Sequence, residues 1–207
     1  MQVAGAALAL FACLATAISL HPRTALDDAV RAFVVAASRP AGVSFFAFVS
    51  TVGSVTPMIV YAIVIIAFVA VRRRSLAPLA VLFAPVVAVF AYLGTKSIVL
   101  RTRPSGMGNA FEGTFSFPSA HATTSSAVCA AVAYLAYREG LLSGATAVAG
   151  AAIFCLFIGI SRIYLDVHWT TDVLGGWCLG IAIGATASAL YETAAGAATG
   201  HAVEQGQ

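Results

Sequence analysis

Residues 161–172 concentrate ionisable side chains between two long apolar runs, 145–160 and 173–190. Such groups are costly near lipid, so a cluster at the edge of an apolar run indicates a functional site. If a helix begins near His168, then His168 and Asp172 are spaced i, i+4 and share one face. The carboxylate could then accept a hydrogen from one imidazole nitrogen and leave the other nitrogen free to attack. The alternative is a polar loop whose histidine only caps a helix.

Two more polar clusters stand at the ends of apolar runs. Lys96 follows one run, with Arg103 and Pro104 seven and eight positions later, and Pro118 opens the next run. Together the clusters supply three cations, two imidazoles, one carboxylate and a helix start, namely Lys96, Arg103, Arg162, His121, His168, Asp172 and Ser119. Arginine forks and lysine point charges bind phosphate oxygens, and the N–H groups of a helix start bind anions. This inventory suits a phosphate.

The composition predicts an integral membrane protein of one domain, residues 1–207. Of the 207 residues, 60% are hydrophobic and only 9% are charged, whereas a soluble domain carries about 25% charged residues. The net charge of +3, with no basic run beyond residues 72–74, argues against nucleic-acid binding. The four cysteines lie in apolar runs and are not spaced as metal ligands or as a redox pair.

Six apolar runs are expected to be transmembrane helices, since a span needs about 20 apolar residues and charges gather at the ends of the runs. The runs are 3–20, 45–71, 76–95, 119–137, 142–160 and 169–191. The first is expected to be an uncleaved span, because Met1 and Gln2 carry no positive charge for a signal peptide. The residues from Glu192 onward are expected to form a loose tail.

Between the first two spans, the sequence predicts a short interfacial helix. Asp27 can cap it, and an apolar stripe recurs at Val30, Phe33, Val34 and Ala37. About eleven residues cannot cross the ~30 Å of hydrocarbon, so this helix is expected to lie along the membrane surface.

Counting spans places all three polar clusters on one membrane face. The ends of the third and fifth spans and the starts of the fourth and sixth emerge on the same side. Basic residues favour the cytoplasmic side of a membrane protein. The side with the clusters carries more of them, but several belong to the site itself. If these are discounted, the dense triplet at 72–74 and Arg138 mark the opposite side as cytoplasmic. The clusters are therefore expected on the extracytoplasmic face.

The order of the three motifs resembles the type 2 phosphatidic acid phosphatase superfamily. The chain reads Lys, six residues, Arg-Pro; then Pro-Ser-x-His; then Ser-Arg, five residues, His, three residues, Asp. The resemblance covers the six-span layout and a motif region at 96–172, each motif at the matching end of a span. One departure is Ala120, where the family usually has glycine; alanine keeps the backbone N–H, so we expect the anion site to survive.

The resemblance implies a role for each motif residue. His168 resembles the nucleophile that takes the phosphoryl group, Asp172 its orienting partner, and His121 the general acid for the leaving oxygen. The residues that resemble the family's phosphate-binding groups are Lys96, Arg103, Ser119, Ala120 and Arg162. Phosphoryl transfer needs an in-line nucleophile and cations on the spread negative charge, which agrees with this inventory. No metal or other cofactor is expected.

The resemblance implies a lipid phosphatase, multi-pass in the cell membrane, such as a bacterial inner membrane. It would remove the terminal phosphate of a lipid phosphate or diphosphate through a phosphohistidine. Undecaprenyl diphosphate, phosphatidylglycerophosphate and phosphatidate all remain compatible. Two other classes stay open: a phosphotransferase that passes the phosphoryl group to an acceptor other than water, and a non-catalytic lipid-binding or transport protein that keeps the anion site.

Each residue also has a simpler interpretation. Lys96 and Arg103 could be juxtamembrane anchors, and His121 could be a solvated helix-start histidine. Ser119 and His121 with an aspartate suggest a serine hydrolase, but the chain lacks a Gly-x-Ser-x-Gly elbow. Asp166, His168 and Asp172 could instead bind a metal, although Arg101 and Asp166 match no motif and are expected to be loop residues. Tyr164 and Trp169 are expected to be interfacial aromatics. Asn109 and Glu112 could contact a lipid headgroup.

Overall fold

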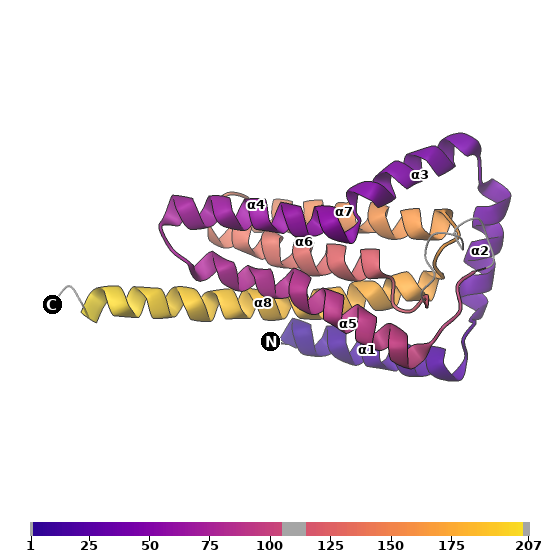
Figure 1. The fold of residues 1–207 in the computed structure, drawn as a ribbon, viewed down its shortest axis with the longest axis horizontal. Helices are drawn as coiled ribbons and strands as arrows, with labels where there is room; N and C mark the ends of the chain where they lie inside the picture. The colour runs from indigo at the N-terminus through magenta and orange to yellow at the C-terminus, as the bar shows by residue number, and fades with distance from the viewer. Residues whose placement is uncertain (1, 105–114, 205–207) are drawn as a thin grey trace.

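The apolar runs fold as helices, most of which lie side by side in one bundle (Figure 1). The computed structural model describes residues 2–104 and 115–204, and describes side chains as far as residue 197; Asn109 and Glu112 lie outside these ranges. Within them every regular element is a helix: α1 (Gln2–Leu20), α2 (Ala25–Ala37), α3 (Pro40–Val52), α4 (Val55–Arg73), the 3₁₀ helix η1 (Ala77–Leu82), α5 (Phe83–Val99), α6 (Ala120–Arg138), α7 (Gly144–Tyr164) and α8 (Thr170–Glu204).

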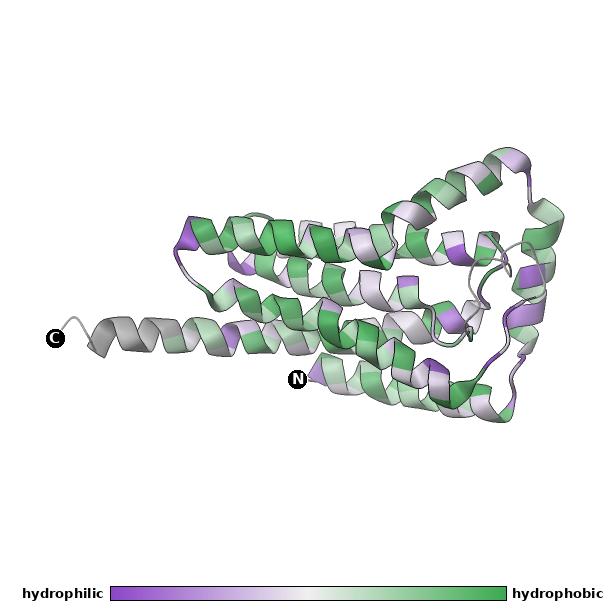
Figure 2. Ribbon diagram, viewed as in Figure 1, coloured by the Kyte–Doolittle hydropathy of each residue, from purple (hydrophilic) through white to green (hydrophobic). Residues whose placement is uncertain are grey.

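The predicted all-α membrane fold is confirmed. Five stretches of the described chain are long and apolar enough to cross a bilayer: Gln2–Leu20, Val55–Arg73, Ala77–Val99, Gly144–Tyr164 and Thr170–Ala197. Apolar residues cover these helices, while hydrophilic residues gather at the bundle end where α2 lies and at the turn after α4 (Figure 2). The remaining predicted span, the fourth at 119–137, is α6, whose 19 residues extend ~28 Å.

Helix α6 is less apolar than its neighbours because it is sheltered by them. It packs against α4, α5, α7 and α8. Thr123, Ser125 and Ser126 are buried, and their hydroxyls donate to backbone carbonyls three or four residues earlier in α6. These three hydroxyls therefore have partners in their own segment of chain, which permits Ser and Thr in a membrane-spanning core.

Two expectations about the spans are wrong. The predicted second span, 45–71, is two helices, α3 and α4, which separate at Gly53 and Ser54 and point in different directions (Figure 1). A side chain on Gly53 would lie 2.0 Å from Ile158 of α7, so the close approach of α7 requires glycine at the break. The tail beyond Glu192 is also helical, because α8 continues to Glu204.

Helix α2 is confirmed as a short helix, and it lies across the end of the bundle (Figure 1). Its N-cap is Thr24, whose hydroxyl accepts from the backbone N–H of Asp27 at 3.1 Å. Phe33 of the predicted apolar stripe is 73% exposed. The contacts with the rest of the chain instead come from the buried Asp27 and the half-buried Arg31, spaced i, i+4, so the polar face of α2 points toward the bundle.

Close packing of α6 against α8 brings two of the motifs together. Gly176, Gly180 and Gly184 recur every four residues along one face of α8, and at each of them an added side chain would clash with α6. At Gly180 the added carbon would lie 1.9 Å from the Ser126 hydroxyl. Small residues at this spacing let membrane helices approach closely. The starts of α6 and α8 consequently meet at the end of the bundle where α2 lies.

The opposite end of the bundle is held by Glu139, which follows α6. Its carboxylate accepts from Tyr191 Oη and from Arg73 Nε. Burial alone would raise the pKa of Glu139, but the hydrogen bonds from Tyr191 and Arg73 outweigh it and hold the pKa below its ordinary value. This cluster ties α4 and α8 to the turn after α6, far from the polar motifs.

Candidate active site

His168 and Asp172 form a buried pair at the start of α8. His168 Nδ1 lies 3.3 Å from Asp172 Oδ2, which also accepts from the backbone N–H of Trp169 at 2.9 Å. A carboxylate only accepts hydrogen bonds, so Nδ1 carries the proton and Nε2 keeps its lone pair. Helix α8 begins at Thr170, and the predicted i, i+4 pair forms with His168 just before the helix.

The Nε2 atom of His168 faces a cation. Arg103 Nη1 lies 3.2 Å from that nitrogen and donates to the carbonyl of Val167 at 2.7 Å. Lys96, buried in the last turn of α5, donates from Nζ to the carbonyls of Phe115 and Ser116. Arg103 also reaches the Phe115 carbonyl, at 3.5 Å, so the two cations meet at one carbonyl beside the histidine.

The second imidazole is connected to the first through Ser50 of α3. Ser50 Oγ lies 3.5 Å from His121 Nε2 and accepts from Arg162 Nη1. The Arg162 carbonyl in turn accepts from the backbone N–H of His168 at 3.3 Å. His121, Arg162 and His168 therefore belong to one continuous set of contacts. No motif includes Ser50, and its hydroxyl within an apolar run gives no signal in the sequence.

Ser119 is buried at the start of α6 but uses its groups differently from the expectation. Its hydroxyl caps the helix by accepting from the Ala122 N–H at 3.5 Å, and its own N–H donates to the Asp172 carbonyl at 3.1 Å. The backbone N–H of Ser119 is therefore engaged with α8 and does not point outward. Ala120 is the first residue of α6, a position whose backbone N–H has no acceptor inside the helix.

Comparison with known proteins identifies the family. Residues 77–195 match the PAP2 superfamily. The chain belongs to this superfamily. It is 37% identical over 89 residues to phosphatidylglycerophosphatase B of Bacillus subtilis (strain 168), a match covering 42% of this chain and 44% of that protein, less than half its length. The crystal structure of a transmembrane PAP2-type phosphatidylglycerolphosphate phosphatase from Bacillus subtilis superposes with a TM-score of 0.85 at 26% identity, over 93% of this chain and 98% of that one.

Arg101, which matches no motif, contacts the buried pair of His168 and Asp172 in this PAP2 protein. The Arg101 guanidinium, expected in a loop, is 2% exposed and donates from Nη1 to Asp172 Oδ1 and to Thr171 Oγ1. Its Nη2 donates to Asp27 Oδ2 at 2.6 Å. Asp27 also accepts from the Thr171 backbone N–H at 2.9 Å, so α2 caps the first turn of α8 from outside that helix.

Asp166 is likewise more than a loop residue in this PAP2 chain. It has a left-handed backbone with φ of 52°, and it accepts from Arg31 Nε and Nη2 at 2.8 and 2.9 Å. The hydrogen bond to Asp166 is the main reason that the pKa of Arg31 is raised. This bidentate pair joins α2 to the turn before His168. It also directs Asp166 toward Arg31, and no three His, Cys, Asp or Glu side chains in the described ranges group as metal ligands.

Trp169 is part of the same structure and is not the interfacial aromatic predicted. The residue is 5% exposed, and its indole N–H donates to the Thr102 carbonyl at 2.9 Å. Three guanidinium groups lie 5.4 to 5.9 Å from its ring centroid, those of Arg23, Arg31 and Arg101. Trp169 thus packs between α2 and the start of α8, where cation–π contacts fix the arginines.

Proposed function

We propose that this protein is a membrane-embedded lipid phosphatase that works through a phosphohistidine on His168. The observation that supports this most is the geometry of one imidazole. Its Nδ1 is held by Asp172, while Nε2 presents a lone pair toward Arg103. A nitrogen fixed in this tautomer beside a guanidinium is suited to attack a phosphorus atom whose oxygens that guanidinium binds.

In the proposed first step, His168 Nε2 attacks the terminal phosphorus and the bond from phosphorus to the lipid oxygen breaks. His121 donates a proton to that departing oxygen. A water then attacks the phosphohistidine with His121 as base, releasing inorganic phosphate and restoring His168. General acid catalysis of this kind gives about 10²–10⁴-fold. The link from His121 through Ser50 to Arg162 supports a place for this acid beside the transferring group.

The cations would bind the equatorial oxygens of the phosphate. Lys96, Arg103 and Arg162 now donate to carbonyl and hydroxyl oxygens, which a phosphate oxygen can replace as acceptors. The N–H of Ala120 adds a donor at the positive end of α6. Three cations can stabilise the developing charge without a metal ion, so we propose a metal-independent reaction. The whole chain, 1–207, would act as one domain.

The proposed substrate carries its phosphate at the membrane surface. Its acyl or prenyl chains would stay in the bilayer while the headgroup reaches the bundle end where α2 lies. Phosphatidylglycerophosphate is our first candidate, because both relatives are named as phosphatases of that lipid. Undecaprenyl diphosphate and phosphatidate have the same terminal phosphate. The arginine triplet at 72–74 lies at the opposite end, which supports an extracytoplasmic site.

The test is phosphate release from these three lipids in mixed micelles with EDTA present. We expect turnover that chelation does not reduce, loss of turnover in His168→Ala, and a phosphohistidine trapped by a rapid quench that avoids acid. His21→Ala, at an exposed histidine, is the matched control. Full activity in His168→Ala, or loss of activity with EDTA, would contradict the mechanism. Phosphorylated acceptor without free phosphate would instead identify a phosphotransferase, and absence of both turnover and phosphohistidine a non-catalytic protein.

A further inference from the structure

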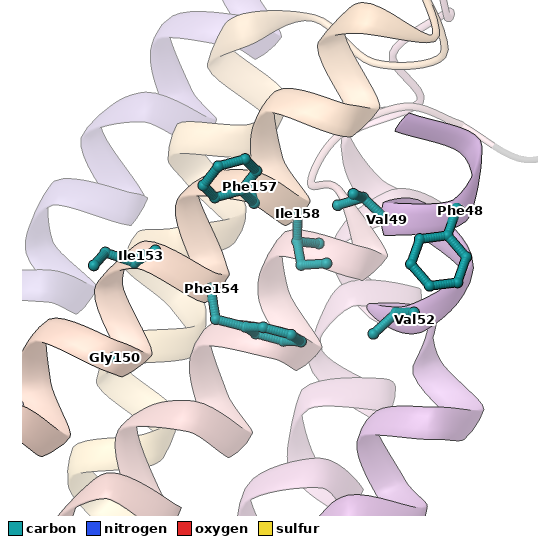
Figure 3. A pocket seen from close by; sticks show the side chains of 8 residues that line it. All are labelled: Phe48, Val49, Val52, Gly150, Ile153, Phe154, Phe157 and Ile158. Atoms are coloured by element: carbon teal, nitrogen blue, oxygen red, sulfur yellow. The ribbon is translucent and has the colours of Figure 1, made fainter. Parts of the chain in front are cut away.

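An apolar groove of about 380 Å³ runs between α3 and α7 (Figure 3). Its α3 side is formed by Phe48, Val49 and Val52, and α7 contributes Phe154 and Ile158. In the close-up these side chains point toward one another across the gap between the two helices. Every other lining residue is apolar too, so the groove is suited to hydrocarbon and not to a headgroup.

On both of its walls, the helix that lines the groove also carries a residue of the proposed phosphate site. On α3, Ser50 follows Val49 directly, and its hydroxyl accepts from Arg162 and lies 3.5 Å from His121. On α7, Arg162 is one turn beyond Ile158 of the groove. A ligand could therefore contact the cation and the groove at the same time.

The depth of the groove matches one leaflet of a membrane. Its α7 residues, from Ile158 to Gly150, lie 4 to 12 positions before Arg162. With a rise of 1.5 Å per residue, their backbone positions stand ~6 to ~18 Å along the axis of α7 from that of Arg162. Half of the ~30 Å hydrocarbon core is ~15 Å, so the groove runs through the region where the chain of a lipid with its phosphate at Arg162 has to lie.

We propose that this groove binds one hydrocarbon chain of the lipid substrate while the terminal phosphate sits among the cations. The proposal rests on the proposed function for the nature of the headgroup. It adds the place where the chain lies and the residues that select it. The protein would distinguish its substrate from bulk lipid because only the substrate makes two contacts. Bulk lipid can also touch α3 and α7, but only a lipid with a terminal phosphate binds both the groove and the cations.

Gly150 gives a way to fill the groove without disturbing the protein. A carbon added at this position would meet no heavy atom within 4 Å, and the residue is exposed on α7. Gly150→Phe should therefore leave helix packing intact and occupy the groove. Gly5 of α1 is equally open and exposed, and Gly5→Phe is the matched control on another face of the bundle.

The experiment uses phosphatidate with a diazirine in one acyl chain, in phosphatidylcholine nanodiscs. We expect photolabelling of residues 48–52 and 150–158 that excess unlabelled phosphatidate removes and excess phosphatidylcholine does not. Gly150→Phe should abolish this labelling, and Gly5→Phe should keep it. Labelling outside these two segments, or labelling equally reduced by both lipids, would overturn the proposal.

A kinetic measurement separates this proposal from the proposed function. For a lipid phosphate with long chains, we expect Gly150→Phe to lower kcat/KM about tenfold, the scale on which an apolar pocket rejects an ill-fitting group. For a dihexanoyl analogue the value should stay at that of wild type. Equal losses for both substrates would overturn the groove as a chain site. Because photolabelling needs no turnover, absence of hydrolysis would refute only the proposed reaction.

Discussion

Replacing Asp27 with asparagine tests whether α2 holds the His168 and Asp172 pair in place. The Asp27 carboxylate accepts from Arg101 Nη2 at 2.6 Å and from the Thr171 N–H at 2.9 Å. Asparagine keeps the size of the side chain and one carbonyl acceptor but removes the negative charge. Any change in catalysis must then travel through Arg101 and the first turn of α8, because Asp27 has no direct contact with His168 among the described hydrogen bonds.

The expected loss of stability follows from burial. The side chains of Arg101 and Asp27 are 1% and 0% exposed. Breaking a buried ion pair costs ~3–5 kcal/mol when the remaining charge is left uncompensated. Arg101 keeps Asp172 as a partner, so we expect a smaller loss of ~1.5–3 kcal/mol, the scale of one charge-assisted hydrogen bond. Arg101 would then move toward Asp172 and disturb its contact with His168.

Activity should change more sharply than stability. Loss of an outer partner of a functional side chain typically lowers activity about 10–100-fold, and we expect a decrease of this size in kcat with little change in KM. The assay is phosphate release well below the melting midpoint, so that unfolding does not contribute. Asp28→Asn is the matched control: Asp28 adjoins Asp27 on α2 and pairs with Arg23, but both side chains are more than half exposed. Equal kcat and equal melting temperature in the two variants would refute the reasoning.

Three further predictions concern other parts of the molecule. Ser50→Ala should lower kcat about 10–100-fold, because a hydrogen bond to a charged group contributes ~1.5–3 kcal/mol and His121 loses its neighbour; unchanged kcat would remove Ser50 from the site. Gly180→Val should lower the melting temperature and cost ~1–3 kcal/mol by overpacking against Ser126, a loss that calorimetry would detect or exclude. Glu139→Gln should lower the free energy of unfolding by ~1 kcal/mol or less above pH 5. Because the pKa of Glu139 is lowered in the folded state, the difference from wild type should vanish as the pH falls below 4.5 and through that pKa. A difference in stability that does not depend on pH would contradict the assignment.

Spacing along the chain was enough to predict the core of the candidate site. His168 and Asp172 are four residues apart at the start of an apolar run, a spacing that predicts their contact, and the pair forms although α8 begins only at Thr170. Counting the predicted spans also places the other site residues on one membrane face. Lys96 ends the third span, Ser119 starts the fourth and Arg162 ends the fifth, so an even number of spans separates any two of them. Lys96, Ser119 and Arg162 were therefore expected on the same side, and in the structure continuous contacts join each of them to His168.

The supporting groups could not be predicted because their partners are distant in the sequence. Arg101 stands in a polar loop with no periodicity, and its carboxylate partners Asp27 and Asp172 are 74 and 71 residues away. The break at Gly53 lies in a short stretch rich in Ser and Thr, 50–56, that was assigned to one apolar run, although a run of 27 residues exceeds the length that one span needs. The glycines facing α6 were readable as a small-residue stripe, and their spacing at 176, 180 and 184 would have predicted the α6 and α8 contact.

The two carboxylate oxygens of Asp172 have different hydrogen-bond partners, and together these partners hold the His168 imidazole in place. Oδ1 accepts from Arg101, and Oδ2 accepts from the Trp169 N–H and faces His168 Nδ1. Because each oxygen has its own partners, rotation of the carboxylate would break at least two hydrogen bonds. Arg101 in turn also contacts Asp27, so one guanidinium bridges two carboxylates and ties Asp172 to α2. Fixing the carboxylate in this way fixes the tautomer of His168, and in the proposed reaction this leaves Nε2 as the attacking atom.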